Sequence, residues 1–147
     1  MKKECFYKEI SSSQCVSIGL LALRVVCGLA FIHHGSMKIQ NPFHWMGPDA
    51  TTPAVLQALA AISEFGGGIA WVMGLLTPLA CLGIFCTMSV AVWTLVSQGD
   101  PFIGMSGPSY ELALVYWSVA LALFMAGPGR YSVDHILFNG RGSKKLD

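Results

Sequence analysis

Four long apolar stretches, separated by polar or turn-forming segments, dominate the chain. They run from about residue 17 to 37, 53 to 76, 78 to 97 and 110 to 126. A helix needs about 20 apolar residues to cross a hydrocarbon core roughly 30 Å thick, and about 17 is the lower limit. The first three stretches meet this length, and the fourth lies near the limit. The pattern therefore predicts an all-α protein, built as a bundle of four transmembrane helices.

Proline and glycine mark the ends of these stretches. Asn41-Pro42 breaks the chain after the first stretch, and Thr52-Pro53 suits a helix start with proline at its first position. Thr77-Pro78 leaves only a very short turn, so the second and third helices should be antiparallel neighbours. Gly127-Pro128-Gly129 ends the fourth stretch. A chain of this length is expected to form one domain, here residues 1–147.

Composition supports a membrane protein over a soluble one. Hydrophobic residues make up 54% of the chain and charged residues 12%, about half of the roughly 25% found in soluble domains. Four long apolar runs leave almost no polar face that could meet water. The net charge of +1 gives no basis for a nucleic-acid partner, so membrane lipid is the expected surrounding.

Lysine and arginine predict the orientation in the membrane, because cytoplasmic segments carry an excess of both. The two ends of the chain, which four crossings would place on one side, hold Lys2, Lys3, Lys8, Arg130, Arg141, Lys144 and Lys145. The opposite side holds only Lys38. The sequence therefore predicts a multi-pass protein of the cell (inner, cytoplasmic) membrane with both termini in the cytoplasm.

Ionisable residues inside spans are rare and usually face the interior of a bundle or a cavity. Counting residues along the predicted helices places Arg24 and Glu64 at similar depths, with opposite charges. His34 and Glu111 both fall in the outer third. We therefore expect two pairs, Arg24 with Glu64 and His34 with Glu111, forming one polar seam. The alternative for Arg24 and Glu64 is a purely structural pair that fixes the register of two helices.

Helical phase selects His34 over its neighbour. At about 100° per residue, His34 lies about 80° from Arg24 around the first helix, whereas His33 lies about 180° away. His34 is therefore the better candidate for an interior position. A histidine beside a carboxylate can exchange protons near neutral pH.

Glycines accompany the predicted seam. Gly28 and Gly35 share the face of Arg24, and Gly67 belongs to a run of three glycines just after Glu64. Small residues let helices approach closely in a membrane. The same lack of side chains next to a buried carboxylate could admit a flat ligand.

A metal site has weaker support. Neighbouring histidines point about 100° apart on a helix, so His33 and His34 are poorly placed to share one ion. The five cysteines form no C-x-x-C pair and read mainly as small buried hydrophobes. The alternative is a redox thiol near the first helix, at Cys5 or Cys15.

Three ordered motifs extend from the first predicted helix to just past the fourth. They are G-L-A-F-I-H-H-G-S-M-K from Gly28, E-F-G-G-G from Glu64 with G-L-L-T-P-L-A from Gly74, and G-P-G-R-Y-S-V-D from Gly127. The set resembles the DoxX family of small membrane proteins, whose members show G-x-x-F-x-x-H-G-x-x-K and G-P-G-R-Y-S-x-D. Pro78 departs from the family, because many members have arginine there.

The resemblance implies a four-helix membrane bundle and a modest link to redox function. Some relatives are small subunits of membrane redox systems, including one that passes electrons from thiosulfate to quinone. Others are linked to defence against oxidants or reactive aromatics. For the last motif, the residues themselves suggest that Arg130 binds lipid phosphate or pairs with Asp134. The alternative there is simple helix termination and anchoring.

The seam and the resemblance together suggest a redox-linked accessory subunit that binds a quinone or similar lipophile and works with a redox enzyme. In this hypothesis His34 and Glu111 exchange protons, while the pocket is formed by Arg24, Glu64, Gly28, Gly35 and Gly67. The alternative is a non-enzymatic membrane scaffold or assembly partner of a redox or detoxification enzyme. A third hypothesis, a small transporter or proton path, would need a homo-oligomer to make room for a pore.

Overall fold

The computed structural model describes residues 14–48, 50–105 and 107–139, and this part of the chain contains helices and no strands. The helices are α2 (Gln14–Lys38), α3 (Ala54–Met73), α4 (Thr77–Ser97), α5 (Glu111–Ala126) and α6 (Val133–Asn139). The prediction of an all-α fold is confirmed for these residues. The first four helices begin and end within three residues of the predicted spans. The short helix α6 was not predicted.

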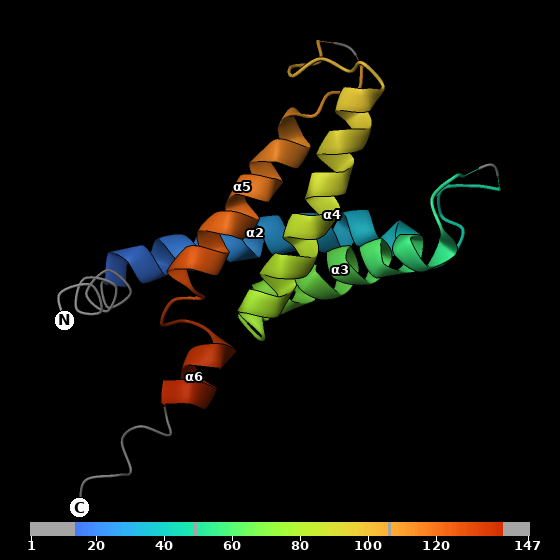
Figure 1. Cartoon of the computed structure of the whole chain (residues 1–147). Helices are drawn as coiled ribbons and strands as arrows, with labels where there is room; N and C mark the ends of the chain where they lie inside the picture. Colours follow the sequence, from blue (N-terminus) through green and yellow to red (C-terminus); the bar gives the residue numbers. More distant parts are fainter. Residues whose placement is uncertain (1–13, 49, 106, 140–147) are drawn as a thin grey trace, which may run out of the picture.

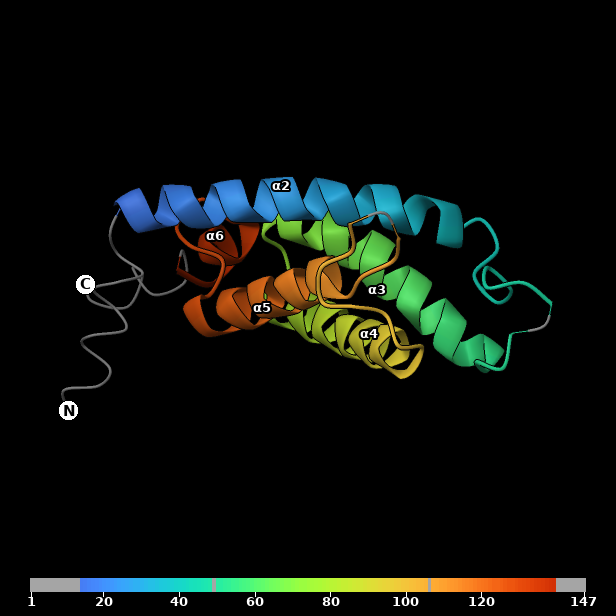
Figure 2. The same ribbon diagram turned by 90° about the horizontal axis from the view of Figure 1, so that it is seen from above.

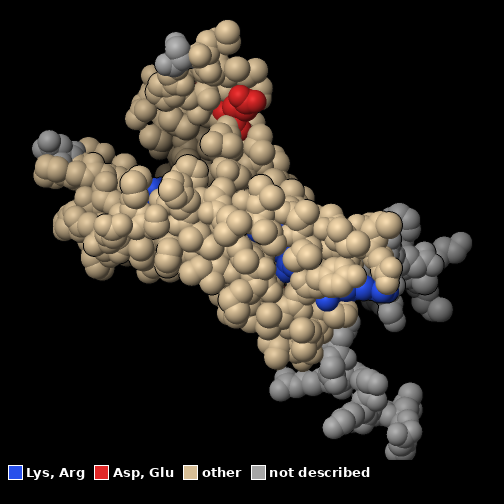
Figure 3. Space-filling model, turned by 180° about the vertical axis from the view of Figure 1, so that it is seen from behind, with Lys and Arg blue, Asp and Glu red and all other residues tan. Residues whose placement is uncertain are grey.

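Three helices, α2, α3 and α4, are long and apolar enough to cross a membrane. Helix α5 is equally apolar but has 16 residues, which at about 1.5 Å per residue gives a length of about 24 Å. A fourth crossing by α5 therefore stays a prediction. Few charged side chains interrupt the surface seen in Figure 3, as expected for a protein whose helices face lipid.

The helices form two antiparallel hairpins, α2 with α3 and α4 with α5. Helix α3 packs against both α2 and α4, whereas α2 and α5 make little contact. Figures 1 and 2 show that the hairpins cross and then diverge, so that the loops at residues 39–53 and 98–110 point in different directions. The four helices therefore do not run parallel along their whole length, as the simplest bundle would have them.

The core lies where the two hairpins cross. Phe31 of α2 and Trp71 of α3 are both almost completely buried, and their rings meet edge to face at 5.6 Å. Tyr116 of α5 packs on the same Phe31 ring at 4.8 Å. Ile84 of α4 and Leu123 of α5 also belong to this cluster. These contacts hold the hairpins together close to the end of the molecule that carries the α3–α4 turn.

The α3–α4 turn consists of residues 74–76, because α3 ends earlier than predicted. Gly74 adopts a left-handed conformation with φ of 66° and closes α3 at Met73, three residues before the predicted end. Leu76 also has a positive φ, 48°, and the next helix begins at Thr77. Glycine adopts such angles without the steric cost that a Cβ brings. The turn is the point at which α6 docks, as described below.

Candidate functional site

Arg24 lies in the predicted cytoplasmic half of the bundle, but its partner is not Glu64. Its side chain is fully buried, and Nη2 donates a hydrogen bond to the carbonyl of Tyr131, in the segment between α5 and α6. The guanidinium lies against Gly74, where a Cβ would come within 1.7 Å of Nη1. The predicted Arg24–Glu64 pair is therefore wrong. Arg24 and Glu64 have similar predicted depths, but Arg24 contacts the segment after α5 and not Glu64.

Asp134 connects α6 to the α3–α4 turn. One carboxylate oxygen accepts a hydrogen bond from the backbone N–H of Leu76 and the other from that of Thr77, both at 2.8 Å. The backbone N–H of Asp134 in turn donates to the carbonyl of Gly74 at 2.9 Å. Its negative charge also stabilises the nearby positive charge of Arg24. The group formed by Arg24, Gly74, Thr77 and Asp134 is called the turn latch below.

Glu64 pairs with Lys38, the last residue of α2. The Lys38 ammonium lies 2.6 Å from one carboxylate oxygen, and the side chains are 24% and 3% exposed, respectively. Among the described residues, the other oxygen, Oε2, is buried and has no hydrogen-bond partner. The sequence predicts that Lys38 lies on the outer side of the membrane, but it does not predict that Lys38 belongs to the site. Its flexible stem lets the ammonium turn back from the helix end towards Glu64.

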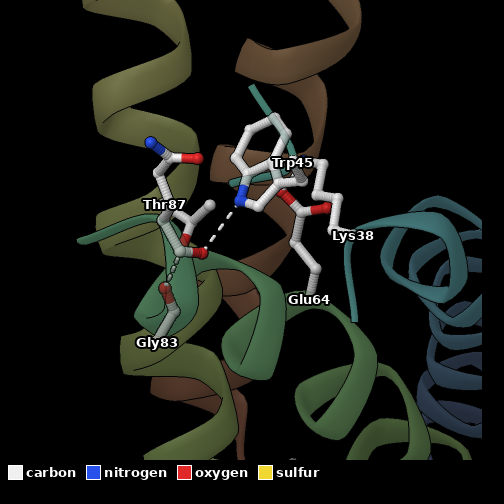
Figure 4. A network of polar contacts seen from close by, with 6 residues as sticks. Lys38, Trp45, Glu64, Gly83 and Thr87 are labelled. Carbon is white, nitrogen blue, oxygen red and sulfur yellow. Dashed lines mark hydrogen bonds and ion pairs between the residues drawn. The ribbon is translucent and has the colours of Figure 1, made fainter. Parts of the chain in front are cut away.

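The loop that follows α2 folds over this ion pair. The Lys38 ammonium sits 4.3 Å from the centre of the Trp45 ring, a distance at which a cation is attracted to an aromatic face. The Trp45 indole donates to the carbonyl of Gln57 at 2.9 Å, and the Gln57 side chain bonds to Met46 and Thr52. Figure 4 shows Trp45, Lys38 and Glu64 side by side. The pair is therefore enclosed by α2, α3 and the loop.

His34 and Glu111 do not form the second predicted pair. Both are exposed, and no hydrogen bond or ion pair joins them among the described residues. His34 lies near the end of α2 and Glu111 at the start of α5, on hairpins whose outer ends diverge in Figure 1. The face of α2 that carries Arg24 and Gly28 packs on α3. His34 lies about 80° from Arg24 around the helix and is therefore outside the buried strip. His33 is also exposed, as predicted for a position away from the interior.

Gly28 and Gly35 allow α2 and α3 to touch, and this leaves no room for a flat ligand between them. A Cβ on Gly28 would lie 2.8 Å from the carbonyl oxygen of Gly68, and one on Gly35 would lie 2.5 Å from the backbone nitrogen of Phe65. Close helix approach is therefore confirmed. As lining of a quinone pocket, these two glycines were predicted wrongly, because the neighbouring backbone fills the space.

Gly67 faces a different helix. A Cβ there would come within 3.1 Å of the Ile84 side chain of α4. Gly67 also borders a groove of about 390 Å³ between α3 and α4. Most of the groove's lining residues are small: Ser63, Gly66, Gly67, Ala70, Ala80, Gly83 and Cys86. This groove is called the α3–α4 groove.

The cysteines and metal ligands are distributed as follows. Cys27 and Cys81 are buried, as small hydrophobes would be, whereas Cys15 and Cys86 are exposed. Cys5, a predicted redox thiol, lies outside the described residues. In the described part of the chain, no three His, Cys, Asp or Glu side chains gather closely enough to hold a metal ion.

Comparison with known proteins places this chain among small membrane proteins. The sequence profile of the DoxX family matches residues 19–97. The "Inner membrane protein YqjF" of Escherichia coli strain K12 is 28% identical over 126 residues, which cover 82% of this chain and 92% of that protein. The "Putative oxidoreductase CatD" of Bacillus subtilis strain 168 is 32% identical over 127 residues, covering 84% and 90%.

No solved structure matches the chain significantly. The match to the family profile covers more than half of the chain, and both relatives match it over most of their length. The apolar helices α2, α3 and α4 agree with a location in a membrane. This chain is a membrane protein of the DoxX family.

Proposed function

We propose that this protein is a redox-linked accessory protein of the inner membrane that binds a quinone or similar lipophile beside Lys38 and Glu64. It crosses the membrane four times, with both termini in the cytoplasm. The observation that carries the proposal is the second carboxylate oxygen of Glu64, which is buried and has no hydrogen-bond partner among the described residues, while the first oxygen lies 2.6 Å from the half-buried Lys38 ammonium. The similarity to a relative named as an oxidoreductase supports the redox link.

The ion pair has the chemistry that a quinone head group requires. A buried carboxylate with one unused oxygen costs stability, and intramembrane ionisable groups usually serve a function. Glu64 Oε2 can accept a hydrogen bond from a hydroxyl, and the Lys38 ammonium can donate one to a carbonyl. When bound, a quinone would supply two-electron chemistry coupled to proton uptake. Glu64 would hold or release the proton, and the Lys38 ammonium would stabilise the negative charge of the Glu64 carboxylate.

The Lys38 side is the more exposed side of the pair. Lys38 keeps 24% of its side chain exposed, whereas Glu64 keeps 3%. Trp45 covers the ammonium and belongs to the loop rather than to a helix. Proton exchange would therefore take place at Glu64 and not at His34 and Glu111, and Arg24 belongs to the turn latch.

A matched pair of substitutions tests the proposed site. The native protein is purified in mild detergent and extracted with organic solvent. Mass spectrometry of the extract should then detect close to one quinone per chain. Glu64→Gln should weaken binding of added ubiquinone or menaquinone by about tenfold or more, because a hydrogen bond to a charged group is worth roughly 1.5–3 kcal/mol. Glu111→Gln makes the same chemical change at an exposed position and should leave binding unchanged.

Two results would contradict this assignment. If the native protein carries no quinone and binds none when quinone is added, the lipophile is wrong. If Glu64→Gln and Glu111→Gln bind quinone equally well, the site is wrong. Circular dichroism of both variants separates a local effect from a loss of folding.

The second candidate function, an assembly partner of a redox or detoxification enzyme, is favoured by the α3–α4 groove. Small residues on a lipid-facing surface let another helix approach closely. A Cβ on Gly66 would meet nothing within 4 Å, and the same is true of Gly19 on α2. Gly66→Leu should therefore abolish co-purification of a partner helix or second copy, whereas Gly19→Leu should preserve it. Equal recovery with both variants would remove this candidate.

A further inference from the structure

Gln57, in the first turn of α3, is a polar residue that is almost completely buried, with 3% of its surface exposed. Its amide oxygen accepts a hydrogen bond from the backbone N–H of Met46 at 3.2 Å, and its amide nitrogen donates one to the carbonyl of Thr52 at 2.9 Å. A glutamine amide carries both an acceptor and donors, so this one side chain holds the loop after α2 at two separate points. Leaving such a buried amide unsatisfied would cost stability.

The backbone of Gln57 binds the indole of Trp45. The indole N–H donates to the backbone carbonyl of Gln57 at 2.9 Å, and the Gln57 side chain binds the N–H of Met46, the next residue along the loop. These contacts fix the Trp45 ring relative to α3. The position of the ring affects the ion pair, because the Lys38 ammonium lies 4.3 Å from the centre of the ring.

Gln57 and Glu64 lie on the same buried face of α3, about two helical turns or roughly 10 Å apart along the axis. Trp45 connects the two levels. Its N–H is bound at Gln57, and its ring covers the ammonium that pairs with Glu64 at 2.6 Å. Figure 4 shows the ring beside Lys38 and Glu64. The ammonium is therefore held between a carboxylate and an aromatic face, both of which attract a cation.

We propose that Gln57 is a positioning residue for the Lys38–Glu64 pair and that it acts through Trp45. Gln57 fixes the loop and so keeps the indole ring on the Lys38 ammonium, and the ring keeps the ammonium directed at Glu64. For ligand binding this inference rests on the proposed function, in which the pair meets the head group of a quinone. A quinone carbonyl then finds the ammonium already oriented, which reduces the cost of ordering it on binding.

Acetylation of Lys38 measures how firmly the ammonium is held, and it needs no quinone. The full chain in mild detergent is treated with sulfosuccinimidyl acetate at fixed pH, and mass spectrometry gives the rate of modification at Lys38. Gln57→Leu should raise this rate by about fivefold, the ratio expected when a cation–π contact is lost. Gln40→Leu makes the same change in the same loop, where the Gln40 amide is exposed and donates to the carbonyl of Ser36. This control should acetylate at the native rate.

A double variant tests whether Gln57 acts through Trp45. Trp45→Leu removes the ring and should raise the acetylation rate by a similar factor. Adding Gln57→Leu to Trp45→Leu should give no further increase, because the contact that Gln57 maintains is already absent. Equal rates in Gln57→Leu and Gln40→Leu, or a further fivefold increase in the double variant, would overturn the proposal.

A milder substitution covers the case in which Gln57→Leu does not fold, as judged by circular dichroism. Gln57→Glu keeps the acceptor for the N–H of Met46 and removes the donor to the carbonyl of Thr52. It then takes the place of Gln57→Leu in both comparisons, and a native rate of acetylation would overturn the proposal in the same way.

Quinone binding separates this inference from the proposed function. Gln57→Leu should weaken binding of added ubiquinone or menaquinone by about fivefold, whereas Gln40→Leu should leave it unchanged. Native affinity in Gln57→Leu, together with faster acetylation of Lys38, would overturn the link between the position of the ammonium and the ligand. A native protein that binds no quinone would overturn the proposed function, while the acetylation rates would still decide whether Gln57 positions Lys38.

Discussion

Replacement of Asp134 by alanine is expected to lower the free energy of unfolding by about 3 kcal/mol. The substitution leaves the backbone N–H groups of Leu76 and Thr77 without the acceptors that they now have at 2.8 Å. It also removes the negative charge that stabilises the buried Arg24. Unfolding of the detergent-solubilised protein by heat or denaturant, followed by far-UV circular dichroism, measures the change.

The control for this prediction lies two residues further along the same helix. Ile136→Ala removes an exposed side chain and should change stability by about 0.5 kcal/mol or less. Combining Asp134→Ala with Arg24→Met should cost less than the sum of the single changes, because each leaves the other's partner groups unsatisfied. Equal stability of the Asp134 and Ile136 variants would show that the turn latch does not hold the fold together.

The helices were predictable from the sequence because one physical requirement dominates in a membrane. Backbone groups must be satisfied within each segment, so four apolar runs ended by Pro and Gly allow little except helices. The predicted end of α3 lies three residues after the observed one, because the apolar run continues through Leu75 and Leu76. The left-handed conformation of Gly74, not a change in polarity, ends that helix.

The pairing of charged residues was not predictable in the same way. Depth and helical phase place a residue along and around one helix, but they do not say which helix is its neighbour. Arg24 is met by the segment after α5, and Glu64 by Lys38 from the end of α2. His34 lies near the end of α2 and Glu111 at the start of α5, and these ends of the two hairpins diverge in Figure 1. That divergence depends on how the core residues of α2, α3 and α5 pack together. The periodicity of apolar residues along the sequence does not predict this packing.

The turn latch left a signal in the sequence that could be interpreted only in part. The motif G-P-G-R-Y-S-V-D from Gly127 contains Asp134, for which the sequence suggests Arg130 as a partner. The Asp134 carboxylate satisfies the first N–H groups of α4, which are otherwise unpaired at a helix start. The acceptor comes from 57 residues away in the chain, so no local capping pattern announces it.

Replacement of Gly68 by alanine is expected to destabilise the protein by roughly 2–3 kcal/mol, as overpacking of a close contact does. The added Cβ would lie 2.7 Å from the carbonyl oxygen of Gly28 and 2.8 Å from the backbone nitrogen of Ile32. Both atoms belong to the backbone of α2, so no side chain can turn away to make room. The two helices must separate, and the contact between Phe31 and Trp71 one turn along should loosen. Thermal unfolding and the fluorescence of Trp71 report these two effects.

Gly66 on the same helix provides the matched control. Alanine there would meet nothing within 4 Å, and its higher helix propensity should stabilise α3 by about 0.5–1 kcal/mol. The two substitutions add the same methyl group to the same helix, two residues apart, so a difference in sign isolates packing against α2 from helix propensity. If Gly68→Ala and Gly66→Ala shift stability equally, backbone contact between α2 and α3 does not determine their separation.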